Sequence, residues 1–305
     1  MPSQKNRMVQ FLFTICLLAI SSAAQAETLL KPFVLGSAVD GDLAAATVKT
    51  RDALTNAGFV VVGKYSPYAK TNIMVVTNDA LRATAAKSDK GGFGAMQRVS
   101  VSEVEGAIQV AYTNPLYLAN VYRMQGDLQG INKSLRAALG AQEEFGAEGL
   151  TAEDLREYHY KLFMPYFDEP YELAEFDNYD AAIAAVEKGL NAKHGGVSKV
   201  YRIDLPGKKE SVFGVAMTRG CSSDEFIMQK IDFNKIKSAP HLPYELLVSN
   251  GNVYALHAKF RIALSFPDLS MMGSNSFFSI MCAPDEIGEA LTAVVKGDKA
   301  SSGEE

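Results

Sequence analysis

The residues best suited to acid–base or metal chemistry near neutral pH are the histidines. There are four, at His159, His194, His241 and His257. Their spacing matches no standard zinc-binding pattern. His194 stands directly before two glycines, which is typical of a helix C-terminus, where a cation interacts favourably with the helix dipole. His257 is the best candidate for a ligand-binding or proton-carrying residue, although a hydrogen-bonded core histidine would give the same pattern.

A second candidate for chemistry is the sulfur-rich segment 270–282. Its soft donors are Met271, Met272, Met281 and Cys282. Such donors suit copper(I), so together with His257 they could form the site of a copper or haem carrier. The alternative is structural, because methionine commonly fills irregular gaps in hydrophobic cores. The segment also lacks the repeated M-x-x-M spacing of many copper carriers.

The chain has three cysteines, Cys16, Cys221 and Cys282. Cys16 lies in the apolar run near the N-terminus, whereas the other two belong to the body of the protein. In an oxidising compartment an even pair favours a disulfide between Cys221 and Cys282. Two buried thiols are the alternative. Two cysteines are too few for a disulfide framework, so a hydrophobic core must stabilise the fold.

Signatures of common catalytic sites are absent from the sequence, including G-x-S-x-G, H-E-x-x-H, C-x-x-C and the P-loop. The glycine-rich segment 90–94 lacks the Gly-Lys-Ser/Thr end of a P-loop, so it predicts a flexible loop. The acidic pairs Glu153-Asp154 and Asp168-Glu169 predict solvated carboxylates. We therefore identify no catalytic residue, and no motif supports enzymatic activity.

The first 26 residues have the three parts of a cleavable secretory signal peptide. Lys5 and Arg7 supply the basic region, an apolar run follows, and Ala24-Gln25-Ala26 matches the A-x-A cleavage pattern. The apolar run of about 13 residues is shorter than the roughly 20 that a membrane-spanning helix needs. We therefore expect a signal peptide at 1–26, cleavage before Glu27, and a periplasmic or secreted protein.

Charge and hydropathy exclude two classes of partner. Removal of Lys5 and Arg7 with the signal peptide changes the formal charge from −5 to −7. This acidity argues against nucleic-acid binding, which depends on neutralising phosphates with Lys and Arg. No later stretch approaches about 18 consecutive apolar residues, so we expect no membrane contact after cleavage.

A similar order of elements recurs about 140 residues apart, which predicts an internal repeat. The first copy, residues 27–141, contains a helix that Asp42 caps and Gly58 ends. Its expected elements are a strand at 33–39, a helix at 43–56 with an apolar stripe of Leu43, Thr47, Val48 and Leu54, strands at 59–65 and 72–77, hairpin arms at 96–102 and 107–112, and a helix at 130–139.

The second copy, residues 170–296, repeats the order strand, helix, about four strands, helix. Its expected elements are a strand at 171–176, a helix at 181–190, strands at 200–205 and 211–218, a further strand at 226–233, hairpin arms at 244–249 and 252–262, and a helix at 284–295. Between the copies, the aromatic segment 142–169 predicts a helical connector packed on the body. Residues 297–305 predict a disordered tail.

The two hairpin turns predict which residues share a face. Pairing across Glu105-Gly106 places Val99, Val101, Ile108, Val110 and Tyr112 together. Asn250-Gly251 is a strong hairpin signal, and the same rule places Tyr244, Leu246, Val248, Val253, Ala255 and His257 together. In this register His257 occupies the place of Tyr112.

Some of these segments resemble the bacterial domain of unknown function 302 family. The resemblance lies in the helix that Asp42 caps, the strand 73–77, and Tyr112-Thr113-Asn114-Pro115-Leu116-Tyr117-Leu118 after the first hairpin. The second copy departs from it, because Lys259-Phe260 stands where Asn114-Pro115 would fall and the nearest equivalent is 266–269.

The resemblance covers about 30–140 and, more weakly, 170–295, and it concerns the fold only. It implies an α+β fold of two pseudo-symmetric repeats with antiparallel sheets, similar to the fold of the TATA-box-binding protein. It implies neither a catalytic residue nor DNA binding.

The sequence therefore favours a non-enzymatic protein that binds a small apolar ligand or a protein partner. The expected site is a groove between the two repeats, lined by Tyr112, Tyr117, Tyr244 and His257. The chain would be a monomer with an internal pseudo-dimer, or a homodimer. The alternative is a periplasmic copper or haem carrier that uses the sulfur-rich segment with His257.

Overall fold

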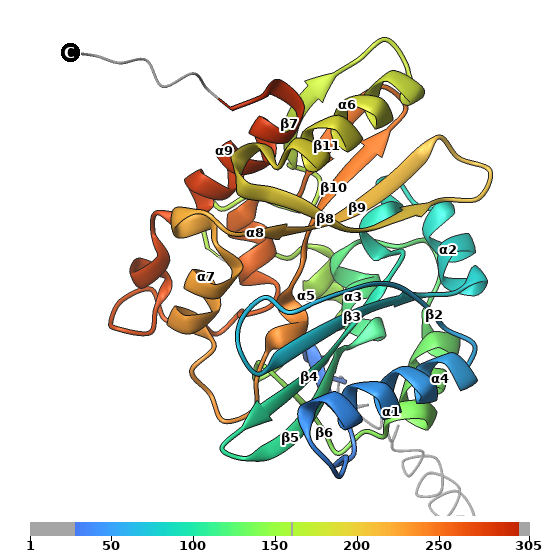
Figure 1. Ribbon diagram of the computed structural model, residues 1–305, viewed down its shortest axis with the longest axis vertical. Coiled ribbons are helices and arrows are strands. Elements are labelled where there is room, and N and C mark those ends of the chain that lie inside the picture. Colours follow the sequence, from blue (N-terminus) through green and yellow to red (C-terminus); the bar gives the residue numbers. More distant parts are fainter. Residues whose placement is uncertain (1–27, 160, 299–305) are drawn as a thin grey trace, which may run out of the picture.

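The computed structural model describes residues 28–159 and 161–298 (Figure 1). The predicted signal peptide at 1–26 and residues 299–305 of the predicted tail lie outside the described residues. Within the described ranges, no helix is both long and apolar enough to cross a membrane.

The first half of the molecule, residues 28–145, contains a six-stranded sheet. Its strands are β1 (Phe33–Leu35), β2 (Val60–Tyr65), β3 (Thr71–Thr77), β4 (Gln97–Val104), β5 (Ala107–Thr113) and β6 (Glu143–Phe145). Its helices are α1 (Leu43–Asn56), α2 (Asp79–Ala86), α3 (Pro115–Val121) and α4 (Gln129–Leu139), with a 3₁₀ turn, η2 (Gly91–Gly94).

The second half, residues 170–298, contains a five-stranded sheet. Its strands are β7 (Tyr171–Glu175), β8 (Val197–Asp204), β9 (Glu210–Met217), β10 (Tyr244–Ser249) and β11 (Asn252–Ala255). Its helices are α6 (Tyr179–Ala192), α7 (Asp224–Ile231), α8 (Ala258–Ala263) and α9 (Ala283–Lys296), with 3₁₀ turns η3 (His194–Gly196), η4 (Gly220–Ser222), η5 (Ala239–His241) and η6 (Phe277–Ile280).

The two sheets have the same order of corresponding strands. The first sheet runs β2-β3-β4-β5-β1-β6, and the second runs β8-β9-β10-β11-β7. Neighbouring strands pair antiparallel in both sheets. The predicted α+β class with antiparallel sheets is therefore confirmed. In the described part of the chain, the second sheet has no counterpart of β6.

The halves meet at their sheet edges and faces, with the first half below the second in Figure 1. Strands β2 and β8 lie side by side, so closely that a Cβ atom at Gly63 would lie 2.8 Å from the Tyr201 Cβ atom. Helices α1 and α4 pack against each other over the first sheet, and α6 and α9 pack over the second. Each half also packs a 3₁₀ turn on the sheet of the other half. The turn η2 packs on β9 and β10, and η5 packs on β3, β4 and β5.

The first predicted helix is confirmed residue for residue as α1. The Asp42 side chain accepts a hydrogen bond from the Ala45 backbone N–H, which caps the helix. The buried side of α1 consists of Ala46, Thr50 and Leu54. Of the predicted stripe, Leu54 is buried and Leu43 packs against the core partly buried, whereas Val48 is exposed. Ala46 and Thr50, spaced four residues apart, complete the buried side.

The first hairpin has the predicted register, whereas the second hairpin differs. Val99 lies opposite Tyr112 and Val101 opposite Val110. In the second hairpin β11 ends at Ala255, two residues before His257. Strands β10 and β11 are shorter than β4 and β5. Counting residues from the turn therefore assigned His257 to β11, although the strand ends before it.

Segment 226–233 is not a strand. Residues Asp224–Ile231 form α7, with Ile227, Met228 and Ile231 buried. Such spacing belongs to a helix, and the two acidic residues of its first turn favour a helix N-terminus. Helices α2, α3 and α8 are further elements that the sequence patterns did not predict.

The connector between the halves packs on the body, but it is mostly not helical. Among its described residues only α5 (Ala152–Arg156) is helical, and Glu143–Phe145 joins the first sheet as β6. Leu155, Tyr158 and Phe167 are buried, whereas Phe163 is 95% exposed. The buried aromatic residues explain the composition of this segment without a continuous helix.

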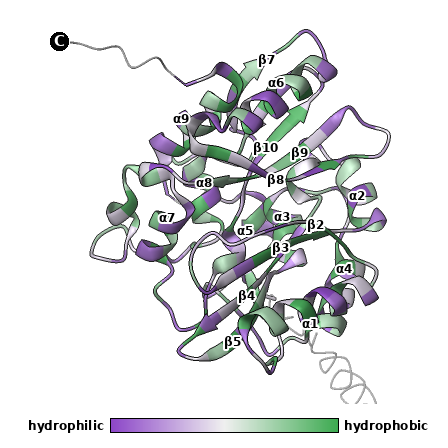
Figure 2. Cartoon of the chain, in the orientation of Figure 1, coloured by the Kyte–Doolittle hydropathy of each residue, from purple (hydrophilic) through white to green (hydrophobic). Residues whose placement is uncertain are grey.

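Segment 90–94 is a buried junction, so the prediction of a flexible loop was wrong. The Gly92 N–H donates to Glu210 Oε1 at 2.8 Å, and Glu210 also pairs with Lys208 at 2.9 Å. Side chains of both halves contribute to one hydrophobic core. In Figure 2 strand β10 is largely hydrophobic, and purple hydrophilic segments appear on α4 and α6.

Candidate functional site

The three tyrosines of the predicted groove lie in the core. Tyr112, Tyr117 and Tyr244 are each at most 2% exposed. The Tyr112 hydroxyl donates to the Gly140 carbonyl oxygen at 2.7 Å, and the Tyr117 hydroxyl donates to the Leu264 carbonyl oxygen at 2.8 Å. Burial raises the pKa of all three hydroxyls. These side chains are therefore occupied within the fold and are not presented to a ligand.

His257 caps a helix and does not share the face of the hairpin as predicted. Its Nδ1 atom accepts a hydrogen bond from the Lys259 N–H at the start of α8, at 3.3 Å. Its ring stacks on Tyr171, with centroids 4.3 Å apart. Partial burial, and then the Lys259 charge, lower the pKa of His257, so the neutral form dominates at pH 7.

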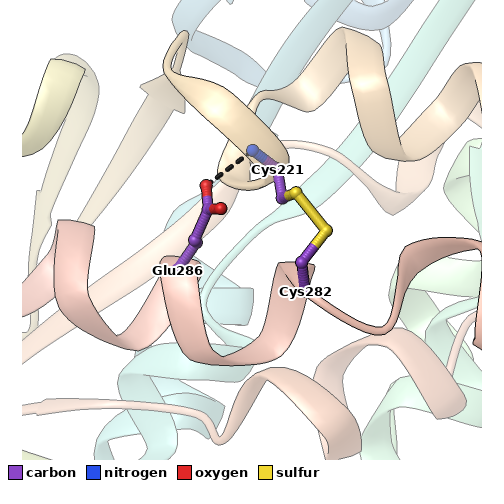
Figure 3. Close-up of side chains that lie close together, drawn as sticks. All are labelled: Cys221, Cys282 and Glu286. Atoms are coloured by element: carbon purple, nitrogen blue, oxygen red, sulfur yellow. Dashed lines mark hydrogen bonds between the residues drawn. A yellow bond between two sulfur atoms is a disulfide. The ribbon is translucent and has the colours of Figure 1, made fainter.

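The predicted disulfide between Cys221 and Cys282 is present. Figure 3 shows Glu286 of α9 pointing toward the bridge, where its Oε2 atom accepts a hydrogen bond from the Cys221 N–H at 2.6 Å. One ligand atom from each of these three residues lies within 4.8 Å of the others. Because the two sulfur atoms are already bonded to each other, we describe this group as a structural cross-link between η4 and the start of α9.

The methionines of the sulfur-rich segment lie at the surface. Met271, Met272 and Met281 are 38%, 72% and 60% exposed. Cys282 offers no thiolate while its disulfide is intact. The methionines of the soft-metal candidate set are therefore exposed thioethers, and the sulfur atom of Cys282 is bonded in the disulfide.

A buried charged cluster joins the halves, and the sequence patterns gave little sign of it. Arg98 Nε donates to Glu245 Oε1 at 3.0 Å, and Arg261 Nε donates to Glu245 Oε2 at 3.2 Å. All three residues are at most 3% exposed. Arg261 also contacts His241 Nδ1 at 3.0 Å, and burial, followed by this arginine, holds the pKa of His241 well below its usual range.

Two buried carboxyl groups lie near the same junction. Asp224 Oδ2 accepts a hydrogen bond from the Tyr65 hydroxyl of β2 at 3.2 Å, so it links the halves. Asp232 Oδ1 accepts one from the Ser238 N–H at 2.9 Å. Burial raises the pKa of each carboxyl group to about 7. Neither is accompanied by a sequence motif, because their burial arises from the packing of the two halves.

The β2–β8 cleft lies between the halves and has a volume of about 570 Å³. Its lining residues are Gly58, Val60, Val62, Thr77, Asn78, Asp79, Ala80, Arg82, Arg202, Ile203 and Asp204. Arg82 pairs with Asp79, and Arg202 Nε pairs with Asp204 at 2.7 Å. The cleft therefore combines an apolar floor with one arginine–aspartate pair from each half.

Two other clefts each lie within one half. The α9 cleft, of about 970 Å³, lies between β7 and α9. The α1–α4 cleft, of about 470 Å³, lies between the two outer helices of the first half. Tyr112, Tyr117, Tyr244 and His257 line none of the three clefts.

Known proteins supply no template for these clefts. Comparison of the chain with protein-family models, curated proteins and solved structures finds no match. The interpretation of the clefts therefore depends on their lining residues and on the elements that position them.

Proposed function

We propose that this chain is an exported, non-enzymatic binding protein made of two copies of one α+β unit. The signal-peptide pattern at residues 1–26 supports export, and a disulfide is the expected state of a cysteine pair in an oxidising compartment. The shared strand order of the two sheets supports the repeat and a fold similar to the TATA-box-binding protein.

The β2–β8 cleft is the proposed binding site, because residues of both halves line it. Ligand sites occur preferentially at interfaces between structural units and have volumes of about 300–1,000 Å³. The volume of about 570 Å³ falls within that range. This cleft takes the place of the predicted groove, with different residues lining it.

The lining favours a small, mainly apolar ligand that carries one charged or dipolar group. Val60, Val62 and Ile203 supply apolar surface, and Val60 is 62% exposed although it is a large hydrophobic residue. The guanidinium groups of Arg82 and Arg202 can bind an anionic group, because Arg presents several donors in a fixed plane. Their aspartate partners keep the rim close to neutral, which suits a ligand of low net charge.

Binding of 8-anilinonaphthalene-1-sulfonate, which has an apolar body and one sulfonate group, tests this site by fluorescence titration. We expect Val60→Trp to weaken binding at least tenfold, because the indole ring would fill the cleft from an exposed position. Val48→Trp is the matched control, since Val48 is a 46% exposed valine on α1 outside the cleft. Equal binding by both variants and the wild type would refute the proposal.

A further inference from the structure

The outer edge of the first sheet is covered by a segment of its own chain. Strand β1 pairs with β5 on one side and with β6 on the other. On the β6 side, Val34 lies opposite Glu144 and Phe33 opposite Phe145. The Phe33 and Phe145 ring centroids are 5.6 Å apart, so an apolar contact anchors this short added strand.

The corresponding edge of the second sheet has no such cover. Strand β7 holds the same place in the strand order as β1, but within the described part of the chain it pairs with β11 alone. Among the described residues, no backbone hydrogen bond is found along the other edge of β7. An exposed strand edge presents unpaired N–H and C=O groups that can pair with a further strand.

A cleft borders this open edge. Tyr171, Glu172 and Leu173 of β7 line the α9 cleft, whose volume is about 970 Å³. Val34 of β1 lies opposite Tyr112, and Tyr171 of β7 lies opposite Ala255 on the equivalent strand of its own sheet. Ala255 matches Val110 in the two hairpins, and Gly36 lies beside Val110. Tyr171 therefore matches Gly36, the residue that directly follows the β6-covered strand β1.

Acidic groups dominate the lining of the α9 cleft. Five carboxylates line it, at Glu172, Asp285, Glu286, Glu289 and Asp298, against two cations, at Arg219 and Lys296. Arg219 is itself within 3.6 Å of Asp298. An occupant of complementary charge would be basic.

We propose that the edge of β7 and the α9 cleft bind an extended, basic segment of a partner protein, which adds to the second sheet as a further strand. Backbone hydrogen bonds to β7 would supply affinity, and basic side chains would meet the carboxylates of the cleft. The first half contains an example of such an added strand, because β6 pairs with β1, which holds the same position in the strand order as β7. This site is separate from the β2–β8 cleft, so either proposal can fail alone.

A basic partner fits this edge better than a second copy of the same chain. Glu172 and Glu175 of β7 are both exposed. Two β7 edges brought together would place these carboxylates near one another, and charged residues on edge strands are a common means of preventing such pairing. A lysine-rich strand instead turns the same carboxylates into favourable contacts.

The test is fluorescence anisotropy with the labelled peptide Lys-Val-Lys-Val-Lys-Val and the folded protein. We expect Glu172→Lys to weaken binding at least tenfold, because Glu172 lines the cleft. Glu157→Lys is the matched control, because Glu157 is exposed at the end of α5, away from β7 and outside the cleft, and its binding should stay within about threefold of the wild type. The same peptide N-methylated at every residue should also bind at least tenfold more weakly, because methylation then removes the N–H groups of both strand edges.

Three results would overturn the proposal. Equal binding of the methylated peptide would mean that charge alone holds it. An equal loss of binding in both Glu→Lys variants, or no binding by the wild type, would remove the assigned site. A concentration-dependent dimer in sedimentation that Glu172→Lys disrupts would assign the edge to a second copy of the chain.

Discussion

The first half covers its outer strand with β6, whereas the second half leaves β7 at the edge of the sheet beside a cleft. The order of the other strands is the same in both halves. The two sheets thus share a strand order while their edges differ, and the proposed partner site is located at the edge where they differ. The proposed partner surface therefore lies where the two sheets differ, and not in the strand order that they share.

A second difference lies inside, on the middle strands of the two sheets. Arg98 lies on β4, and Glu245 lies on β10. They form an ion pair across the junction, with both side chains 1% exposed. Two identical residues at these positions would repel each other or leave polar groups unpaired. The opposite charges therefore make the halves complementary and distinguish one from the other.

Glu245→Gln should break this complementarity with the largest effect on stability. The change leaves Arg98 and Arg261 buried without a carboxylate, and removing one partner of a buried ion pair costs about 3–5 kcal/mol. Urea unfolding of the folded variant measures the free energy of unfolding. Glu103→Gln is the control, because its partner Lys70 is 66% exposed, and exposed pairs contribute about 0–1 kcal/mol. Equal losses in the two variants would contradict the special role of the buried pair.

The sequence predicted the framework better than the junction. The cap Asp42, the turn Glu105-Gly106 and the disulfide depend on short-range patterns or on a cysteine pair, and all are present. The buried Arg98–Glu245 pair depends on how two distant strands meet, and no local pattern contains that information. Likewise, the polar residue Ser100 is buried because the second half covers its face of the sheet.

The candidate site was less predictable than the fold for the same reason. Tyrosines are common in ligand-binding grooves, which is why Tyr112 and Tyr244 were predicted to line one, but their rings are buried in the hydrophobic core. The position of His257 depended on the length of the second hairpin, and a turn signal fixes the register without fixing the length of the arms. The clefts are formed by exposed valines, ion pairs and a strand edge, and these are ordinary surface features in a sequence.

Asp224 allows the junction to be probed by pH, with a smaller expected effect. Burial raises the pKa of its carboxyl group to about 7, against about 3.9 in the unfolded chain. Below pH 4 the group is protonated in both states, and between pH 4 and 7 only the unfolded state releases the proton. The free energy of unfolding should therefore fall by about 2–4 kcal/mol over this window.

Asp224→Asn should flatten the fall in stability between pH 4 and 7, leaving the contribution of Asp232, whose pKa burial also raises to about 7. Urea unfolding at half-unit pH intervals measures the profile. Asp180→Asn is the control, because Asp180 is exposed in the first turn of α6. An unchanged slope in Asp224→Asn would show that this carboxyl group does not carry the pH dependence of the junction.

The residues that cap the helices after the two hairpins allow the most detailed comparison of the two halves. Asn114 caps α3 and also donates to the Lys31 carbonyl oxygen at 2.9 Å and to Glu144 of β6 at 3.0 Å. His257 caps α8 and instead stacks on Tyr171 of β7. One cap thus binds the segment just before β1 and strand β6 through hydrogen bonds, and the other contacts β7 through aromatic stacking.

His257→Asn gives the second half the cap of the first and removes the stacking on Tyr171. We expect a loss of about 1 kcal/mol, because aromatic contacts contribute about 0.5–1.5 kcal/mol and the amide can still cap α8. His257→Ala removes both interactions and should cost about 1 kcal/mol more. Thermal and urea unfolding of the two variants separate capping from stacking. If His257→Asn were as damaging as His257→Ala, the asparagine would not replace the cap, and the two positions would not be interchangeable between the halves.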